Sequence, residues 1–338
     1  MPIALDATYS LGKNLTGVGV YSRELLWGLA RSHPEEEFLF CYRPNRFVRS
    51  YGASLPKNAV RRLLVGTPPG DIFHALNQRV DAKARRTIST FHDLFVMSGE
   101  YSSPEFRERF TLQAKHAAER SDLIVTVSQF TAGQVEKLLG FPAARIRVIP
   151  HGVKMPAASH ARRENIVLFV GVIQRRKNIA RLVKAFEALP TDWKLILAGD
   201  PNGYGAEAEH RAIAGSPRHS QIEVLGRVTN TQLESLYRRA RIFAFPSLDE
   251  GFGIPVLEAM GHGIPVVTSN CSGMPDAAGD AALLVNPKDT DELASALLRL
   301  AEDQTLRDDL IRRGLERARS FSWDAAVERT WAVYKELR

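Results

Sequence analysis

The sequence predicts an α/β protein of two domains, each built on a parallel sheet with helices on both faces. The first observation is the length, since 338 residues make about two domains of ordinary size. The second is that short, wholly apolar runs alternate with amphipathic segments along the chain. Strands that are apolar throughout are expected where helices cover both faces of a sheet. The composition, 44% hydrophobic and 25% charged, excludes a disordered, collagenous or coiled-coil chain.

The first half contains six apolar runs that we expect to form strands and three amphipathic segments that we expect to form helices. The expected strands cover residues 3–7, 37–42, 61–65, 87–91, 122–127 and 145–149. The expected helices cover residues 18–31, 104–120 and 130–139. This alternation predicts a first doubly wound domain over residues 1–155.

The second half repeats the pattern and ends in three helical segments. Strands are expected at residues 166–170, 193–198, 222–225, 242–246 and 265–269. Asn178 is interpreted as the N-cap of a helix whose residues Ile179, Leu182, Val183 and Phe186 share one face. Further helices are expected at residues 231–240, 290–302, 306–319 and 323–337. We place the second domain at residues 156–320, after a boundary segment at 152–164. The last helix, within 321–338, is expected to pack back on the first domain.

The formal charge is divided unevenly between the two halves. Residues 1–155 contain 21 Lys and Arg against 14 Asp and Glu, a net +7, whereas residues 156–338 contain 24 of each kind. A basic domain joined to a neutral one suggests an anionic partner such as nucleic acid, lipid headgroups or a phosphorylated substrate, although an arginine-rich composition alone would also produce it. The chain has no recognisable nucleic-acid motif, so we expect no nucleic-acid partner.

Cysteine content and hydropathy predict a cytoplasmic protein. The two cysteines, Cys41 and Cys271, lie far apart in the sequence, which fits a reducing compartment. No run approaches 18 apolar residues and the N-terminus does not resemble a signal peptide, so we expect neither a membrane span nor export. The protein could still rest on the anionic inner face of the cytoplasmic membrane through basic residues of its first half. The arginines considered for that contact are Arg43, Arg46, Arg49, Arg61 and Arg62.

The segment from residue 248 to residue 260 carries the strongest local signal for a ligand site. Gly251 and Gly253 follow an expected strand, and Pro255 is well placed to open a helix, whose N-terminal amides would attract an anion. Glu250 precedes this helix and Glu258 lies inside it, about 12 Å further along. That separation argues against a hydrolase pair and favours two acids at opposite ends of one elongated ligand. A helix start with a capping acid and an incidental glutamate is the alternative.

The segment also resembles the Glu-x7-Glu signature of retaining nucleotide-sugar glycosyltransferases with the GT-B fold. The chain as a whole most resembles glycosyltransferase family 4, and the resemblance covers nearly its full length. Further segments resemble those of the family in the same order, namely Thr16–Tyr21, Thr90–Asp93, Val127–Thr131, Val148–Val153, Val170–Gly171, Arg175–Asn178, Phe245–Met260 and Phe321–Trp323. The resemblance implies two Rossmann-like domains facing across a cleft, with the donor bound by the second domain and the acceptor by the first.

The resemblance also implies roles for individual residues. The catalytic set would be His92, Lys177, Arg176 and Glu250. Lys177 and Arg176 would neutralise the leaving diphosphate, Glu250 would lie near the donor sugar, and His92 would contact a sugar hydroxyl. The donor site would comprise Gly17, Gly171, Gly226, Arg227, Gly251, Phe252, Gly253, Ile254 and Glu258, the last binding both ribose hydroxyls. The acceptor site would comprise Gly19, Tyr21, Asp93 and Ser128.

Several of these residues have other interpretations when they are taken alone. A histidine at a strand end, such as His92, is more often structural, and a basic loop is more often solvated. Gly17-x-Gly19-x-x-Ser22 is an incomplete dinucleotide fingerprint, which argues against a dehydrogenase. Many family members have Arg directly after the glycine of the phosphate-binding strand, where this chain has Val172. Whether Arg175 or Arg176 supplies the second cation beside Lys177 is therefore open.

These features together predict a retaining, metal-independent hexosyltransferase that needs no cofactor. Asp289-Thr290-Asp291 has metal-binding spacing, but it precedes a helix and is explained by capping. The nine histidines show no metal-ligand pattern. The segments around Lys177, His92 and Gly251 look most like those of mannosyltransferases of surface-polysaccharide pathways. The resemblance therefore implies GDP-mannose as the preferred candidate for the donor and a glycan or a lipid-linked glycan as the acceptor. A UDP-hexose donor and a sugar-nucleotide epimerase on the same fold are the alternatives.

Overall fold

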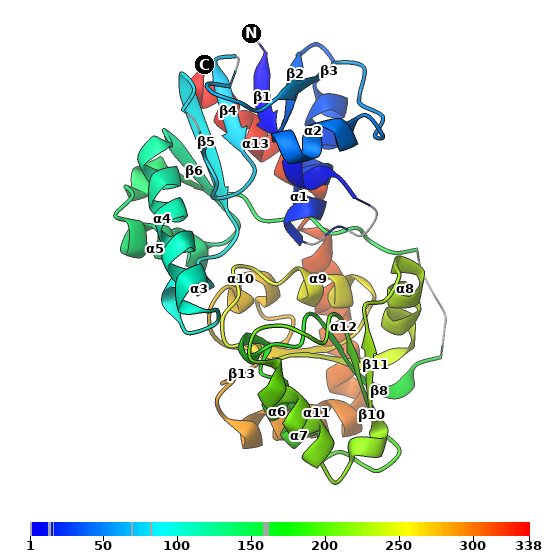
Figure 1. Cartoon of the computed structure of the whole chain (residues 1–338). Helices are drawn as coiled ribbons and strands as arrows, with labels where there is room; N and C mark the ends of the chain where they lie inside the picture. Colours follow the sequence, from blue (N-terminus) through cyan, green and yellow to red (C-terminus); the bar gives the residue numbers. More distant parts are fainter. Residues whose placement is uncertain (1, 13–14, 16, 69, 82, 158–161) are drawn as a thin grey trace. The chain divides into compact units, whose positions relative to one another are not determined.

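The computed structural model describes residues 2–12, 15, 17–68, 70–81, 83–157 and 162–338 (Figure 1). Thr16 of the glycine-rich segment and residues 158–161 of the boundary segment therefore lie outside the described residues. The chain divides into two compact units. Unit 1 comprises Met1–Ser98, Pro104–Gly152 and Phe321–Arg338, and unit 2 comprises Gly99–Ser103 and Val153–Ser320.

Unit 1 is built on a parallel sheet of seven strands in the order β3-β2-β1-β4-β5-β6-β7. The strands are β1 (Ile3–Asp6), β2 (Phe38–Tyr42), β3 (Ala59–Leu63), β4 (Ile72–Ala75), β5 (Arg86–Phe91), β6 (Leu123–Thr126) and β7 (Ile146–Val148). The helices are α1 (Gly17–Ser32), α2 (Pro44–Ser50), α3 (Phe95–Ser98), α4 (Pro104–Arg120), α5 (Gln129–Leu139) and α13 (Trp323–Leu337). One core cluster lies between the sheet, α1 and α13, and a second cluster includes apolar residues of α4 and α5.

Unit 2 is built on a parallel sheet of six strands in the order β10-β9-β8-β11-β12-β13. The strands are β8 (Glu164–Val170), β9 (Lys194–Ala198), β10 (Ile222–Gly226), β11 (Ala240–Phe245), β12 (Val266–Ser269) and β13 (Leu283–Val285). The helices are α6 (Ile179–Phe186), α7 (Ala206–Gly215), α8 (Asn230–Arg239), α9 (Ile254–Gly261), α10 (Met274–Ala278), α11 (Thr290–Glu302) and α12 (Gln304–Arg319). The predicted α/β class with two Rossmann-like domains is confirmed.

The structure also contains elements that the sequence did not predict. Strand β4 has the sequence Ile-Phe-His-Ala and is completely buried, so a buried histidine hides it from an apolar pattern. Strand β13 is only three residues long, and α2, α3 and α10 have seven, four and five residues. The ten-residue helix α7 was also not predicted. Asp289 caps α11 as expected, with its side chain accepting bonds from the amides of Asp291 and Glu292.

Asn178 occupies the N-cap position of α6, as predicted, but its side chain does not cap the helix. Asn178 adopts the left-handed conformation, with φ 61°, and makes no side-chain cap bond. The side-chain nitrogen Nδ2 of Asn178 instead donates to the carbonyl oxygens of Pro246 (3.0 Å) and Pro287 (2.7 Å). The residue therefore joins the start of α6 to the loops that follow β11 and β13.

Helix α13 belongs to unit 1 although it lies at the far end of the sequence. Val327 packs over Gly28 of α1, where an added Cβ would lie 2.5 Å from a Val327 methyl group. The Tyr334 hydroxyl lies 2.7 Å from Nδ1 of His74 on β4, and His74 Nε2 lies 2.8 Å from Oγ1 of Thr90 on β5. Thr90 in turn bonds Tyr21 of α1 at 3.0 Å. This buried chain of hydrogen bonds connects α13 to two strands and to α1.

Three histidines of unit 1 are held neutral by burial. Burial, with His92 nearby, lowers the pKa of His74 to about 3. Burial also lowers the pKa of His92 to about 4, against a smaller opposing effect of its bond to Leu76. The pKa of His151 falls well below its ordinary value for the same reason, with His92 adding to it. The unfolded chain therefore binds more protons than the folded chain in mild acid, and stability falls with pH from about 6.5 downward.

We expect His74→Gln to reduce this acid sensitivity. Each buried histidine contributes a slope of up to about 1.4 kcal/mol per pH unit between its unfolded and folded pKa values. Removing one of them should flatten the fall of the melting temperature between pH 7 and pH 4, even if the variant starts from a lower stability. Thermal unfolding as a function of pH measures this slope. His116→Gln, at an exposed position of α4, is the matched control, and an equal slope in both variants would contradict the explanation.

Candidate active site

The carboxyl edge of the sheet in unit 2 is shaped by glycines that let loops approach closely. Gly171 follows β8 and Gly199 follows β9, and a Cβ at Gly199 would clash with the Gly171 carbonyl group. The Gly171 amide donates to the Ala198 carbonyl oxygen at 2.8 Å, and the Gly199 amide donates to the Gly226 carbonyl oxygen at 2.8 Å. In doubly wound sheets, ligands bind outside this edge. The side chains that gather there are therefore the first candidates for a site.

Two cations converge on one carboxylate at this edge. Arg176 and Lys177 lie in a 3-10 turn after β8, and Glu250 lies in the loop after β11. Arg176 Nη1 lies 2.7 Å from Glu250 Oε1, and Lys177 Nζ donates to the same oxygen. Lys177 Nζ also lies 4.4 Å from the centre of the Phe245 ring, a favourable cation–π geometry. Arg176, Lys177 and Glu250 define the ion cluster of unit 2.

The ion cluster keeps Glu250 ionised. Burial raises the pKa of this carboxyl group, but the charges of Arg176 and Lys177 and their hydrogen bonds outweigh burial and lower the pKa to about 2. Glu250 is therefore a carboxylate at neutral pH and cannot donate a proton to a leaving group. It can accept hydrogen bonds from hydroxyl groups.

The loop before α9 is fixed by backbone contacts with the segment before α10. The Glu250 amide donates to Ser272 Oγ at 3.2 Å, and the Gly273 amide donates to the Glu250 carbonyl oxygen at 2.9 Å. A Cβ at Gly273 would clash with the Gly251 carbonyl group. Gly253, the residue before α9, has φ 116°, and a Cβ there would lie 2.6 Å from the Met274 methyl carbon. Only glycine satisfies both conditions at position 253.

Glu258 on α9 is half-buried and hydrogen-bonded to a residue of another helix. The hydroxyl group of Tyr237 on α8 donates to Glu258 Oε2 at 2.9 Å, while Oε1 accepts no hydrogen bond from the described residues. The Tyr237 ring stacks on His262 with 4.6 Å between ring centres. Burial raises the pKa of Glu258, and the Tyr237 bond and the nearby His262 offset only part of that effect.

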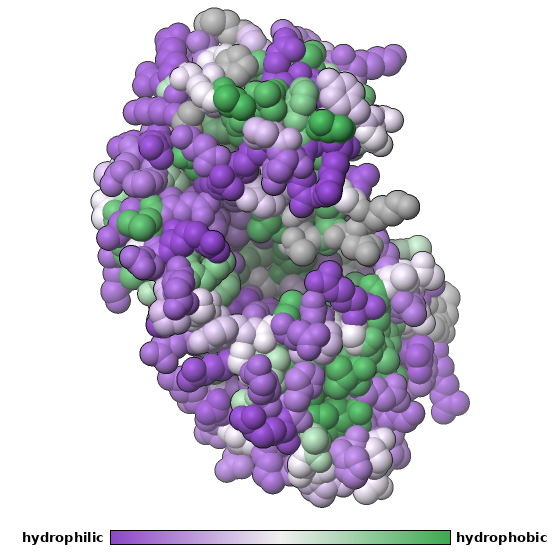
Figure 2. Space-filling view, viewed as in Figure 1, coloured by the Kyte–Doolittle hydropathy of each residue, from purple (hydrophilic) through white to green (hydrophobic). Residues whose placement is uncertain are grey.

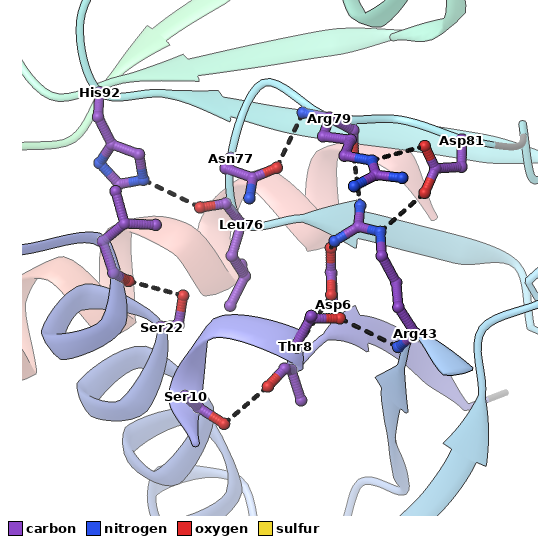
Figure 3. Close-up of polar contacts among 12 residues, drawn as sticks. Asp6, Thr8, Ser10, Ser22, Arg43, Leu76, Asn77, Arg79, Asp81 and His92 are labelled. Carbon is purple, nitrogen blue, oxygen red and sulfur yellow. Dashed lines mark hydrogen bonds and ion pairs between the residues drawn. The ribbon is translucent and has the colours of Figure 1, made fainter. Parts of the chain in front are cut away.

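The carboxyl edge of the sheet in unit 1 carries a separate polar network (Figure 3). His92, directly after β5, lies with Nε2 2.9 Å from the Leu76 carbonyl oxygen, so Nε2 carries the proton. Its Nδ1 lies 3.4 Å from His151 Nε2, and the two rings stack with 5.3 Å between their centres. The Tyr21 ring meets the His92 ring edge-on at 4.7 Å. The neutral His92 ring is therefore fixed in one tautomer by its neighbours.

The same edge contains a buried arginine between two carboxylates (Figure 3). Arg43 follows β2, and its Nη1 lies 3.0 Å from Oδ2 of Asp6, the last residue of β1. Arg43 Nε donates to Asp81 Oδ2 at 2.7 Å. The Arg43 side chain is only 7% exposed and Asp6 is completely buried. Arg43 therefore cannot rest on a membrane, and the sequence-based assignment of this arginine to the basic surface is wrong.

Comparison with known proteins identifies the family. The family model described as "Glycosyl transferases group 1" matches residues 154–317, and the model described as "Glycosyltransferase Family 4" matches residues 43–155. The O-antigen chain mannosyltransferase B of Escherichia coli is 32% identical over 284 residues, which cover 79% of this chain and 74% of that protein. The chain belongs to the family 4 glycosyltransferases. The predicted resemblance is thereby confirmed.

Other relatives of this glycosyltransferase are longer or more distant. The serotype-specific mannosyltransferase WbdA of Escherichia coli is 26% identical over 95% of this chain, which spans only 43% of that protein. Among solved structures, the sucrose-phosphate synthase of Thermosynechococcus elongatus has a TM-score of 0.74 at 23% identity, covering 99% of this chain and 98% of that chain. HepE of Anabaena in complex with UDP has a TM-score of 0.74 at 16% identity, covering 99% of each chain. These structures support the GT-B fold class.

The glycosyltransferase brings three of the predicted donor-side residues into contact and places others along the same edge of the unit 2 sheet. Lys177, Arg176 and Glu250 form the ion cluster, in which Arg176 is the second cation beside Lys177, while the Arg175 side chain is 57% exposed. A contact between Arg176 and a diphosphate stays a prediction. Gly226 ends β10 with φ 67°, and Arg227 after it pairs with Asp200 at 2.6 Å on the surface. Gly171, Gly251, Phe252, Gly253, Ile254 and Glu258 lie in loops or α9 at the carboxyl edge of the unit 2 sheet.

The predicted acceptor residues have defined places within unit 1. Tyr21 is 2% exposed and bonded to Thr90, and Ser128 caps α5 by accepting a bond from the Thr131 amide at 2.9 Å. Gly19 lies in the first turn of α1, where a Cβ would lie 3.0 Å from the Tyr9 carbonyl oxygen. Gly17 begins α1, and Asp93 follows His92. Acceptor contacts by Gly19, Tyr21, Asp93 and Ser128, and donor contacts by Gly17 and His92, stay predictions.

Some residues of the site were not predicted. Tyr237 lies 21 positions before Glu258 on a different helix, and nothing in the local pattern of α8 marks it. Ser272, with φ 56°, likewise becomes visible only through its bond to the Glu250 amide. Among the described residues, no group of three or more His, Cys, Asp or Glu side chains could hold a metal ion. No helix in the described part of the chain is long and apolar enough to cross a bilayer.

We expect Glu258→Gln to stabilise the unliganded chain. Because folding raises the pKa of Glu258, the folded state favours the protonated acid, and the carboxylate present at neutral pH lowers stability. Glutamine keeps an oxygen for the Tyr237 hydroxyl and removes that charge, so stability at pH 7 should rise. Calorimetric unfolding at several pH values measures the gain, which should shrink as the pH falls and Glu258 is protonated.

Glu250→Gln is the matched comparison for this experiment. It removes the carboxylate that Arg176 and Lys177 share, so it should lower stability at pH 7 by up to about 3 kcal/mol. Both variants replace one glutamate by its amide, yet the expected changes have opposite signs. A loss of stability in Glu258→Gln similar to that in Glu250→Gln would refute the explanation.

Proposed function

We propose that this glycosyltransferase moves a hexose, with mannose as the first choice, from a nucleotide-diphospho-sugar to a glycan or lipid-linked acceptor, with retention of configuration and without a metal or other cofactor. The observation that carries the proposal is the ion cluster, which gathers Arg176, Lys177 and Glu250 at the carboxyl edge of the unit 2 sheet. Similarity to E. coli O-antigen mannosyltransferases favours GDP-mannose as the donor and surface-polysaccharide synthesis as the setting.

Donor binding would exchange one anion for another at the ion cluster. The diphosphate would take the place of Glu250 on Lys177 and Arg176, because phosphate oxygens accept charge-assisted bonds from both cations. Glu250, released but still ionised, would accept bonds from hydroxyl groups of the donor sugar. Glu258 would bind the ribose through Oε1, which has no hydrogen-bond partner among the described residues. Unit 1 would then supply the acceptor.

The charge of the residues suits departure of a nucleoside diphosphate. Negative charge grows on the leaving phosphate in the transition state, and fixed cations lower the energy of that charge without a metal ion. Glu250 is a weak candidate for a covalent nucleophile, since two cations hold its carboxylate and lower its pKa to about 2. We therefore propose attack on the same face, with the departing phosphate oxygen accepting the acceptor proton.

A transfer assay tests the proposal. Wild-type enzyme should release GDP from GDP-mannose in step with elongation of a polyprenyl-diphosphate-linked or mannose-terminated acceptor. The new linkage should have the α configuration of the donor by NMR. Lys177→Ala should lower kcat by two or three powers of ten, roughly the effect of losing one transition-state charge contact. Chelation with EDTA should leave the rate unchanged.

The alternatives give different results in the same assay. A UDP-hexose enzyme would release UDP and leave GDP-mannose intact, and an epimerase would alter the sugar without releasing a nucleotide. Arg211→Gln, an exposed substitution on α7, is the control for loss of a positive charge in unit 2. Full activity of Lys177→Ala, or dependence on a divalent ion, would overturn the proposed diphosphate site.

We also propose that unit 1 contacts the anionic inner surface of the cytoplasmic membrane through α2 and β3. Exposed apolar side chains gather here beside arginines, and Figure 2 shows apolar patches on the surface over these elements. Val48 is 79% exposed and Tyr51 is 66% exposed. Apolar side chains that enter the interface and arginines that meet lipid phosphates would act together. The surface includes Val48, Tyr51, Leu63, Val65, Arg46, Arg49 and Arg62.

We expect Val48→Asp to reduce binding to anionic vesicles severalfold, because it adds a negative charge to the centre of the proposed contact. The wild-type chain should sediment with vesicles of phosphatidylglycerol and phosphatidylcholine at low salt and should dissociate from them at high salt. Leu112→Asp, at an exposed apolar position of α4 that is 53% exposed, is the control. The proposal would be refuted if vesicle binding were the same with and without Val48→Asp, at low and high salt, and with and without anionic lipid.

A further inference from the structure

Unit 2 contains a pocket at the edge of its sheet opposite the ion cluster. The pocket has a volume of about 230 Å³. Arg163 lies just before β8, Arg241 is the second residue of β11, and Arg307 projects from α12, so the pocket lies at the amino ends of the strands. The ion cluster lies beyond the carboxyl ends of β8 and β11, about 20 Å away along strands of six or seven residues. The lining residues are Arg162, Arg163, Arg241, Pro265, Gln304, Arg307 and Ile311.

Four guanidinium groups line this pocket, and no lining residue is acidic. Arg163 Nη1 donates to the carbonyl oxygens of Tyr237 (2.7 Å) and Ala240 (2.8 Å). Arg241 Nη2 donates to the Arg163 carbonyl oxygen at 3.1 Å. Carbonyl oxygens satisfy hydrogen-bond donors but do not neutralise a positive charge.

Arg307 is bonded in the same way. Its Nη1 donates to the carbonyl oxygens of Leu300 (2.6 Å) and Ala301 (2.9 Å), and its Nη2 donates to Gln304 Oε1 at 2.5 Å. Among the described residues, none of the four arginines of the pocket forms an ion pair with a carboxylate. The pocket therefore carries several positive charges that the surrounding chain does not balance by direct contact.

The acidic residues closest to the pocket in the sequence bond to other groups. Glu164 pairs with Arg239 at 2.6 Å, and Asp303 accepts a bond from the Leu306 amide as the cap of α12. Asp308 accepts a bond from Gln304 at 2.6 Å. Burial and the nearby charge of Arg241 lower the pKa of Arg307, against the weaker opposing effects of Asp308 and Asp303. Like-charge repulsion within the pocket is thus only partly offset.

A comparable pocket in unit 1 shows the difference. It also has a volume of about 230 Å³ and is lined by Arg85, Arg86 and Arg338. There, however, Arg85 pairs with Asp71 at 3.2 Å and Arg338 pairs with Glu36 at 2.6 Å. Carboxylates thus pair with two of the three arginines that line the unit 1 pocket, whereas among the described residues none pairs with an arginine that lines the unit 2 pocket.

We propose that the arginine pocket of unit 2 binds a small polyvalent anion bearing a phosphate or diphosphate group, at a site separate from the ion cluster. Guanidinium groups present paired N–H donors that match phosphate oxygens, and Arg241 uses only Nη2 in a bond to the described residues. The Nη atoms of Arg163 and Arg307 already donate to groups of the chain, so these two residues contribute mainly positive charge. The volume is below the range of about 300–1,000 Å³ for larger ligands, so it fits the anionic group itself rather than a whole nucleotide. A bound anion would tie the residues before β8 to α12.

Equilibrium dialysis of the full chain with labelled inorganic pyrophosphate tests this site. We expect Arg241→Gln to weaken binding at the pocket by about tenfold or more, since it removes one charge-assisted contact. Glutamine can still donate to the Arg163 carbonyl oxygen, so the fold should persist. Arg162→Gln, at an exposed position, should weaken binding in the same direction and guards against a folding defect in the first variant. Lys177→Ala separates binding at the ion cluster from binding at the pocket.

The matched control is Arg319→Gln. Arg319 is an exposed arginine on α12, the helix that carries the pocket residue Arg307, and lies about 18 Å along the helix from it. Its substitution should leave pyrophosphate binding unchanged. Each pocket substitution, Arg241→Gln and Arg162→Gln, is also combined with Lys177→Ala. The site is disproved if both double variants bind pyrophosphate as tightly as the Lys177→Ala single variant does. It is equally disproved if Arg319→Gln weakens binding as much as the two pocket substitutions do.

A second arm identifies the source of the phosphate group. The same variants are sedimented with phosphatidylcholine vesicles that contain or lack phosphatidate. Loss of phosphatidate-dependent binding in Arg241→Gln, but not in Arg319→Gln, would assign the pocket to a lipid headgroup. If Arg241→Gln weakens pyrophosphate binding but leaves vesicle binding unchanged, the pocket is assigned to a soluble anion. If neither ligand depends on Arg241, the proposal fails.

Discussion

The carboxylate of Glu250, shared by Arg176 and Lys177, is the interaction on which the candidate site depends. It joins a loop after β8 to a loop after β11, 73 positions later in the sequence. Two cations in one small volume would repel each other, and the shared carboxylate relieves that repulsion in the unliganded enzyme. The same arrangement leaves the cations ready for another anion. Under the proposed function, Glu250 occupies the place of the donor diphosphate on these two cations until the donor binds.

Glu258 illustrates the opposite compromise. Its carboxylate is half-buried with one tyrosine hydroxyl as partner, which disfavours the charged form in the folded chain. A protein selected for stability alone would not place a glutamate there. Under the proposed function, the two ribose hydroxyl groups would donate hydrogen bonds to this carboxylate and stabilise its charged form.

The sequence predicted the two-sheet architecture because wholly apolar strands and amphipathic helices are local features. It also predicted Lys177, Arg176, Glu250 and Glu258, through a resemblance whose motifs keep their order and spacing. It missed β4, because the hydrogen bonds that make His74 acceptable in a core come from Thr90 and Tyr334. It misjudged Arg43 as a surface cation, because Asp6 and Asp81 neutralise it only after folding. The errors share one cause, since each polar residue was assessed without its tertiary partners.

The return of α13 to unit 1 has a consequence for how the chain is made. Unit 2 is almost entirely continuous in sequence, whereas the core of unit 1 lacks Val327, Trp331 and Tyr334 until the last helix is available. During translation, unit 2 can finish folding as soon as it leaves the ribosome, but the earlier-synthesised unit 1 must wait with one face of α1 uncovered. The order of synthesis and the order of completion are therefore reversed, and the waiting half is the one most exposed to chaperones and proteases.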